Sequence, residues 1–211
     1  MGVRSGLRLR LTSGDPIAVI DRVLDSAEWD RVWRSRVESA FHDTDPINLL
    51  LDEFWTKAFS SCSSEAQILD IACGNGALAR CLGNALEADA ETINYVGVDK
   101  ASINPPPDST FGKLRPQFLP NLTVEGATFG LSTFDLIVSQ FGLEYSDKVK
   151  TIELASKWIK PGGRMVMVIH SSSSAITFES KQILEQLRVI KESAVIPLIY
   201  KLLERMENLS E

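Results

Sequence analysis

A turn that contains two glycines, Gly74 and Gly76, carries the strongest chemical signal in the sequence. It follows a run of apolar residues and leads into a segment with helical spacing. Glycine suits this place because the backbone must reverse sharply and let a ligand approach without a Cβ in the way. Asp70 lies four residues before Gly74, where its negative charge would repel a phosphate and attract a cationic group. The turn therefore predicts a ligand with an ammonium group; the alternative is a purely structural turn.

A second carboxylate, Asp99, ends the next apolar run, residues 93–98. An acid at the end of the second strand of an α/β sheet can accept hydrogen bonds from ribose hydroxyls. The backbone of Lys100, which follows it, would then lie beside the base. Asp99 thus predicts a nucleoside-bearing ligand, a class that includes NAD, and the alternative is an ordinary surface carboxylate that ends a strand.

Two later motifs complete the series. The run 134–139 predicts a buried strand, and it leads into Gln140 and Phe141 at the end where such sheets hold their ligands. The segment 160–163, Lys-Pro-Gly-Gly, predicts a turn from a helix into a further strand. Proline ends a helix there, and the glycines permit the reversal of the chain.

The elements that must position these residues alternate between short apolar strands and helices or loops. Strands that are apolar throughout and separated by crossovers indicate a parallel sheet covered on both faces. Right-handed crossovers then predict an α/β, doubly wound, Rossmann-like fold with a mostly parallel sheet and helices on both faces. Strands are expected at 68–72, 93–98, 122–124, 134–139 and 164–169, helices at 77–86 and 148–159, and mainly loop at 101–118.

We expect three regions along the chain. Residues 1–64 would form an N-terminal helical extension on the acceptor side of the site, where it could act as a lid. Residues 65–170 would form the cofactor-binding core. Residues 171–211 would form a C-terminal helical segment, with a break near Pro197 because proline interrupts a helix.

The N-terminal extension is expected to contain three helices. Trp29 and Trp33 recur at helical spacing in the second of them, which predicts a core face or an aromatic lid over an acceptor. Helix start signals stand at Asp15-Pro16, Ser26 and Asp45-Pro46.

The spacing Asp70-x-x-x-Gly74-x-Gly76 resembles the glycine motif of class I (Rossmann-like) S-adenosylmethionine-dependent methyltransferases. The other motifs follow in the order of that family across residues 67–170. The resemblance implies S-adenosylmethionine as the cofactor and S-adenosylhomocysteine as its product. In this family an acid after the third strand binds the adenine amino group, and Glu125 is the candidate here. The implied cofactor site comprises Asp70, Ala72, Cys73, Gly74, Asn75, Gly76, Asp99, Lys100, Glu125, Gln140 and Phe141.

The sequence also departs from the family. A helix between the second and third strands is replaced by the proline-rich residues 101–118, and the two final strands of the usual sheet are apparently missing. We expect a truncated chain or a missing tail; otherwise the C-terminal segment would cover the sheet edge, with a partner subunit in a possible homodimer.

Methyl transfer is a displacement at a carbon that the sulfonium already activates, so the protein must mainly align cofactor and acceptor. A general base helps where the acceptor must lose a proton. His170, Glu144 and Tyr145 are the candidates, because they follow the expected fifth and fourth strands. The acceptor is expected to be a small molecule. A non-catalytic relative that retains the cofactor fold, or an NAD-dependent oxidoreductase, are the alternatives.

Composition narrows the classes of partner and compartment. The net charge of −6 and the pI of about 5.1 argue against nucleic acid as a partner. Three cysteines without a CxxC pair and two histidines do not predict a metal site or a disulfide framework. With no apolar run of about 18 residues and no signal-peptide pattern, we expect no membrane association and a cytoplasmic location.

Overall fold

The computed structural model describes residues 26–35, 46–86 and 92–208. They fall into two compact units: one is Ser26–Ser174, and the described part of the other is residues 175–208. The helix expected to start at Asp15-Pro16 lies outside the described residues.

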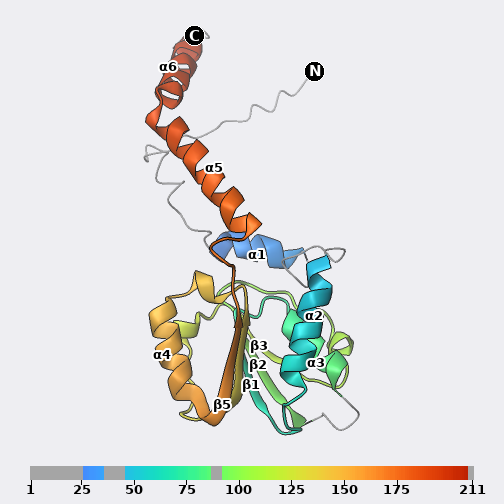
Figure 1. Ribbon diagram of the computed structural model, residues 1–211. Coiled ribbons are helices and arrows are strands. Elements are labelled where there is room, and N and C mark those ends of the chain that lie inside the picture. Colours follow the sequence, from blue (N-terminus) through green and yellow to red (C-terminus); the bar gives the residue numbers. More distant parts are fainter. Residues whose placement is uncertain (1–25, 36–45, 87–91, 209–211) are drawn as a thin grey trace, which may run out of the picture. The chain divides into compact units, whose positions relative to one another are not determined.

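The first unit is built on a five-stranded sheet in which every pairing is parallel (Figure 1). The strand order is β3-β2-β1-β4-β5, so the chain starts at the centre and winds outward in both directions. This arrangement confirms the predicted doubly wound, Rossmann-like fold, and it places ligands at the carboxyl ends of β1 and β4, where the winding reverses. The strands are β1 (Gln67–Ile71), β2 (Asn94–Val98), β3 (Gln117–Leu119), β4 (Phe134–Gln140) and β5 (Ile159–Val168).

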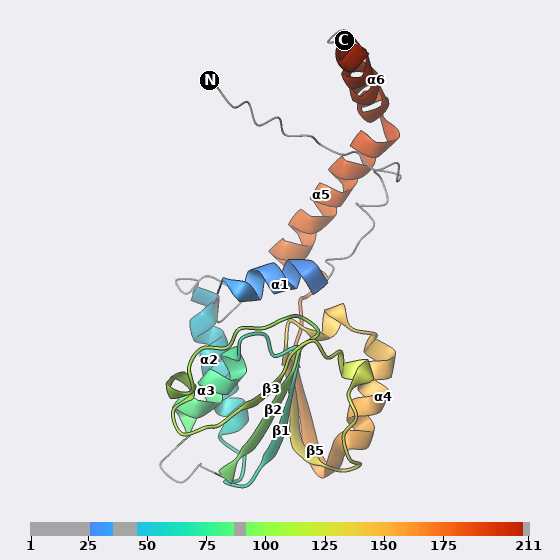
Figure 2. The same ribbon diagram turned by 180° about the vertical axis from the view of Figure 1, so that it is seen from behind.

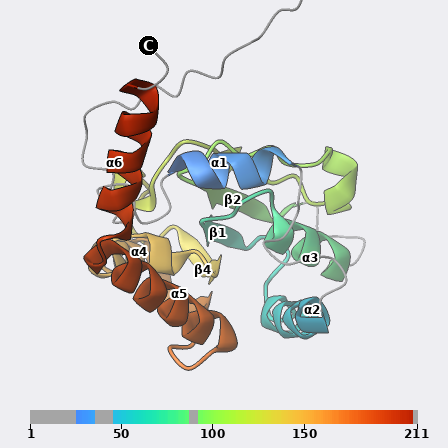
Figure 3. The ribbon, with the colours of Figure 1, turned by 90° about the horizontal axis from the view of Figure 1, so that it is seen from above.

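Helices cover both faces of the sheet. Helices α2 (Pro46–Phe59) and α3 (Ala77–Ala85) pack on one face through a core that includes Trp55, Leu82 and Ile68. Helix α4 (Lys148–Trp158) packs on the other face through Ala155 and Trp158. Figures 1 and 2 show the two layers on opposite sides of the strands. Helix α1 (Ser26–Arg34) lies over the carboxyl ends of the strands, as the view from above shows (Figure 3).

The alternation of side chains along each strand explains why both faces need a cover. Ile68 of β1 contributes to one core and Leu69 to the other, because successive strand residues point to opposite faces. Both side chains are fully buried. The strands therefore read as continuous apolar runs, as the sequence indicates.

The third strand lies earlier in the chain than predicted. It spans Gln117–Leu119, whereas the predicted segment 122–124 leads into a 3₁₀ helix at Val124–Gly126. The prediction was wrong because Val124 is apolar for a different reason: its side chain is buried against the α4 face of the sheet. The expected loop at 101–118 is confirmed up to the start of β3, apart from a short 3₁₀ helix at Asp108–Phe111.

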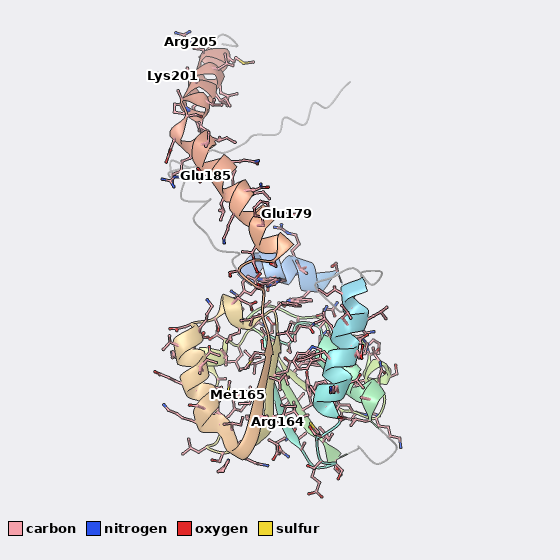
Figure 4. The ribbon with its side chains drawn as sticks, in the orientation of Figure 1. Arg164, Met165, Glu179, Glu185, Lys201 and Arg205 are labelled. Atoms are coloured by element: carbon pink, nitrogen blue, oxygen red, sulfur yellow. The ribbon has the colours of Figure 1, made fainter. Side chains whose placement is uncertain are left out.

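The Lys-Pro-Gly-Gly segment is part of a strand and not a separate turn before it. Strand β5 begins at Ile159, and the register against β4 shifts between Phe134, which pairs with Ile159, and Leu136, which pairs with Arg164. A bulge absorbs the extra residues, and Gly162 adopts a left-handed φ of 81° there. Arg164 and Met165 follow the bulge on β5 (Figure 4). The guanidinium of Arg164 donates to the backbone oxygen of Ala58 in α2, which ties this strand to the helix layer.

The second unit contains α5 (Ala175–Glu192) and α6 (Val195–Asn208). The break between them falls at residues 193–194 and not at Pro197, which sits in the first turn of α6, where a missing N–H breaks no helical hydrogen bond. Charged side chains such as Glu179 and Glu185 on α5 and Lys201 and Arg205 on α6 are drawn in Figure 4. Within the described ranges, no strand follows β5. No helix there combines the length and the apolar character that a membrane crossing requires.

Candidate functional site

The glycine turn after β1 is held against the end of β2. Gly74 and Gly76 have φ of 51° and 92°, the left-handed region that glycine adopts without strain. The backbone N–H of Gly74 donates to Oδ2 of Asp99 at 2.8 Å, and that of Ala101 donates to Oδ1 at 2.8 Å. Each oxygen of Asp99 therefore accepts one backbone hydrogen bond. The side chain is 6% exposed, and the desolvation raises its pKa, while the hydrogen bonds from Ala101 and Gly74 oppose the rise.

Asp70 lies beneath this turn and is in the opposite situation. It is 1% exposed, and only one of its oxygens, Oδ2, has a partner among the described residues: the hydroxyl of Tyr95, at 2.5 Å. Its Oδ1 is buried without a hydrogen bond in the described part of the chain. Burial raises the pKa of Asp70 to about 8, the Tyr95 hydrogen bond opposes the rise, and the nearby charge of Asp99 adds to it. A buried acceptor without a hydrogen-bond donor costs free energy, so a ligand that donates to this oxygen would stabilise the site.

Residues 72 and 73 carry the backbone out of β1. Ala72 adopts a φ of 58°, an uncommon conformation for a residue with a Cβ. Gly142 makes room for it, because a Cβ on Gly142 would collide with the Cβ of Ala72. The buried thiol of Cys73 has a pKa raised well above its ordinary value, mainly by desolvation and then by Asp70 and Asp99. That thiol stays protonated and serves packing.

The end of β4 is fixed to its neighbours by three contacts. The hydroxyl of Ser139 donates to the backbone oxygen of Ile71 at 2.8 Å, and Oε1 of Gln140 accepts from the indole N–H of Trp55 at 2.5 Å. Phe141 follows in a left-handed conformation, with its N–H bonded to the oxygen of Val168. Gln140 also lines a hollow beside α2 and α3, together with Asn48, Asp52, Trp55 and Arg80.

Two of the three catalytic candidates, His170 after β5 and Glu144 after β4, lie together. Nδ1 of His170 lies 3.1 Å from Oε1 of Glu144, and the same oxygen accepts the backbone N–H of His170 at 2.6 Å. The other oxygen of Glu144, Oε2, is buried without a partner among the described residues. The ring of Phe141 packs on the imidazole with centroids 4.5 Å apart. The geometry thus brings His170 and Glu144 into one pair, with Phe141 beside it.

Tyr145 is placed apart from that pair, against the N-terminal helix. Its ring meets the edge of Trp29 at a centroid distance of 5.2 Å, and Trp29 in turn stacks on Trp33 at 5.7 Å. Burial raises the pKa of Tyr145, and Glu144 adds to the rise. The phenol therefore stays protonated at neutral pH.

Two of the expected cofactor residues have other contacts. Oε1 of Glu125 accepts from the backbone N–H of Asp147, the N-cap residue of α4, at 2.7 Å and from the hydroxyl of Thr151 at 3.3 Å, so it holds the start of α4. Lys100 follows Asp99 at the end of β2 and is half-buried, and its charge lowers the pKa of Asp99 against the effect of burial. The adenine contacts of Glu125 and Lys100 stay predictions.

Tyr95 and Trp33 were not assigned to the cofactor site from the sequence. Tyr95 looks like one apolar residue in a buried strand, yet it pairs with Ile68 across the sheet and supplies the only hydrogen bond that the structure records to the side chain of Asp70. The hydroxyl in an otherwise apolar run is the signal that could have revealed it.

In the part of the chain that the structure describes, no cluster of three potential metal ligands occurs.

Comparison with known proteins assigns the family. A model of the methyltransferase domain family matches residues 42–199, which is 158 of the 211 residues. A comparison with curated protein sequences returned no match.

Several solved structures are similar to this chain, which spans 58% of the first of them, the YcgJ protein of Bacillus subtilis (21% identity, TM-score 0.46, 65% of this chain covered). A methyltransferase from Aquifex aeolicus, described as S-adenosylmethionine-dependent, is 16% identical with a TM-score of 0.49, covering 72% of this chain and 76% of its own. Phosphoethanolamine N-methyltransferase 2 of Haemonchus contortus is 18% identical with a TM-score of 0.46, covering 67% and 35%. The family model matches three quarters of the chain, and the parallel sheet and the glycine turn are both present. The chain therefore belongs to the methyltransferase domain family, which confirms its resemblance to the class I enzymes.

Proposed function

We propose that this chain transfers a methyl group from S-adenosylmethionine to a small acceptor molecule and releases S-adenosylhomocysteine. The observation that carries the proposal is the unpartnered, buried Oδ1 of Asp70 beneath the glycine turn. An ammonium at that oxygen would supply both the missing donor and a positive charge. The amino group of the methionine part of the cofactor has this chemistry, whereas the pyrophosphate of NAD does not.

The residues at the strand ends fit the cofactor in type. The turn from Ala72 to Gly76 would carry it, because the two glycines leave the backbone open to close approach. Asp99 would accept the ribose hydroxyls, Gln140 and Phe141 would line the methionine part, and Lys100 and Glu125 would lie toward the adenine. When bound, the cofactor supplies a methyl group on a positively charged sulfur, and the protein orients it and excludes water.

We further propose that His170 acts as the general base. The contact of Nδ1 with Glu144 orients the imidazole, and in the described chain no hydrogen bond to Nε2 is recorded. The acceptor would give its proton to Nε2 while its electron pair forms the new bond to the methyl carbon; the bond from that carbon to sulfur would break, with S-adenosylhomocysteine as the leaving group. The charge of Glu144 would stabilise the resulting imidazolium. The proton then leaves to water.

The proposed function is tested by calorimetric titration of the whole chain with S-adenosylhomocysteine, with NAD as the competing ligand. We expect binding of the first in the micromolar range, about −8 kcal/mol, and none of the second. Asp99→Ala should weaken binding at least about tenfold, because the ribose loses a charged acceptor. Asp135→Ala is the matched control, since Asp135 is the second residue of β4 and lies at the amino ends of the strands, away from the site.

Each outcome of this titration separates the proposal from its alternatives. Binding of NAD alone would replace it with an oxidoreductase. Binding of S-adenosylhomocysteine without turnover of any acceptor would favour a non-catalytic relative. No binding of either ligand, by the folded wild-type chain or by any folded variant of its N-terminal helix, would contradict the proposal itself.

The role of His170 has its own prediction. His170→Gln should lower kcat by about 100-fold and leave the affinity for S-adenosylhomocysteine unchanged. The measurement uses the acceptor that turns over in a screen of amines, phenols, alcohols and thiols with methyl-labelled cofactor. An unchanged kcat in this variant would contradict the role of His170 as base.

A further inference from the structure

Helix α1 rests directly on the glycine turn. The ring carbons Cζ2 and Cη2 of Trp33 lie 2.7 Å from the place where a Cβ on Gly74 would stand. The indole therefore fills the space that the absence of a side chain leaves open at Gly74. That space is the one through which a ligand approaches a glycine turn. Trp33 is only 9% exposed, so the contact is a packed one.

Three contacts tether α1 to three separate loops at the carboxyl edge of the sheet. The amide of Asn75 in the glycine turn donates to the backbone oxygen of Trp33 at 2.9 Å. Oδ1 of Asp30 accepts from the backbone N–H of Ser102, in the loop after β2, at 2.6 Å. Trp29 meets Tyr145, in the loop after β4, edge to face. Figure 3 shows α1 crossing this edge of the sheet.

The recognition groups under the helix already have backbone partners. Both oxygens of Asp99 are bonded to backbone N–H groups. Oδ1 of Asn75 accepts from the backbone N–H of Asn104 at 2.7 Å, and Asn75 is 1% exposed. Each oxygen of Asp99 can still accept a second hydrogen bond, so these contacts do not exclude a nucleoside. The Trp33 ring does, because it fills the space over Gly74.

We infer that α1 is an autoinhibitory gate, in which Trp33 occupies the cofactor's place on Gly74 and must leave before the cofactor binds. This inference rests on the proposed function. A nine-residue helix held by a few polar and aromatic contacts can open locally without unfolding of the sheet. The observed dissociation constant is then the intrinsic one divided by the open fraction, so weakening the gate raises the affinity.

The test is titration of the full-length chain with S-adenosylhomocysteine in the wild type and in three variants. Trp33→Ala removes the ring, and it should tighten binding about tenfold or more. Asp30→Ala removes the tether to Ser102 without touching the ring, and it should tighten binding by a smaller factor. Arg31→Ala is the matched control, because Arg31 is exposed on the same helix, and it should bind like the wild type.

Stopped-flow mixing supplies a second readout. If opening of α1 limits association, the observed rate in the wild type levels off as ligand concentration rises. In Trp33→Ala the rate should instead keep rising linearly with ligand.

The outcomes distinguish the gate from the proposed function. Binding by Trp33→Ala alone, or tighter binding by it, supports both. Equal or weaker binding by Trp33→Ala than by the wild type overturns the gate and leaves the proposed function standing. Absence of binding in all four proteins overturns the proposed function and the gate with it. If Trp33→Ala does not unfold cooperatively, Asp30→Ala decides, and wild-type affinity in that variant overturns the gate.

Discussion

In the sequence, Asp70 and Asp99 look like two similar carboxylates at the ends of neighbouring strands. In the structure they differ in their hydrogen-bond partners. Asp99 has a backbone donor on each oxygen, whereas Asp70 has one oxygen on Tyr95 and one without a partner in the described chain. Desolvation dominates at Asp70, because a single neutral hydroxyl does not replace the water that a carboxylate loses. Asp70 is therefore the group whose protonation responds most to what lies on the turn.

The stability of the protein should report this protonation. Burial raises the folded-state pKa of Asp70 to about 8 from an ordinary value of 3.8. Between these values the unfolded chain has released the proton and the folded protein still holds it, so rising pH lowers the stability of the wild type. Asp70→Asn lacks this proton, so its stability relative to the wild type should rise by on the order of 4 kcal/mol between pH 5 and pH 8. Urea unfolding at the two pH values measures the difference.

Asp135→Asn is the control, because its effect on stability should change with pH in the opposite direction. Burial opposes ionisation of Asp135, but hydrogen bonds from Lys160 and Gln67 outweigh it and lower its pKa. The ionised form is thus the stabilising one, and its removal should cost stability at pH 8 and little near pH 3. A difference between Asp70→Asn and the wild type that does not grow with pH would show that Asp70 is ionised in the folded protein.

At the scale of elements, the loop that replaces a helix between β2 and β3 is held by packing against α3. Gly83 on α3 faces the backbone of Phe111, and a Cβ at this position would collide with the Phe111 carbonyl oxygen. Phe111 itself is buried and contacts Phe118 of β3, with ring centroids 5.6 Å apart. This close contact therefore fixes the loop between β2 and β3 on helix α3.

Gly83→Ala should destabilise the protein although alanine favours helices. The gain in helix propensity is about 1 kcal/mol, and the collision with a backbone atom costs about 1–3 kcal/mol or more, so the net effect on the free energy of unfolding is a loss. Asn84→Ala, at the exposed neighbouring position of the same helix, should be neutral or slightly stabilising. Chemical denaturation of both variants measures the contrast, and a stabilised Gly83→Ala would mean that the loop does not pack on α3 as described.

At the scale of the whole molecule, the strand order explains how residues far apart in the chain meet. Because β1 lies between β2 and β4, the carboxyl ends that carry Asp70, Asp99 and Gln140 stand side by side. Residues 26–174 form one compact unit, so α1 and α2 pack with the sheet. The proposed cofactor site and the gate over it lie entirely within that unit.

Much of this arrangement is local and could be predicted. Four of the five strands, the glycine turn and helix α3 follow from apolar runs, glycine positions and helical spacing, which act over a few residues. The third strand was misplaced because Val124 is apolar for packing and not for pairing. The Lys-Pro-Gly-Gly turn was misjudged because a bulge depends on the register of the partner strand.

The sequence by itself determined which residue types stand at the strand ends and, through their order, the fold that brings them together. Only the tertiary structure decided which contacts those side chains make: that Glu125 binds the N-cap residue of α4, that Glu144 contacts His170, and that Trp33 covers Gly74. The reason is physical. Several side chains far apart in the sequence could bind the same donor or fill the same space. Which of them lies close enough to do so depends on the folded chain, and no local sequence pattern shows it.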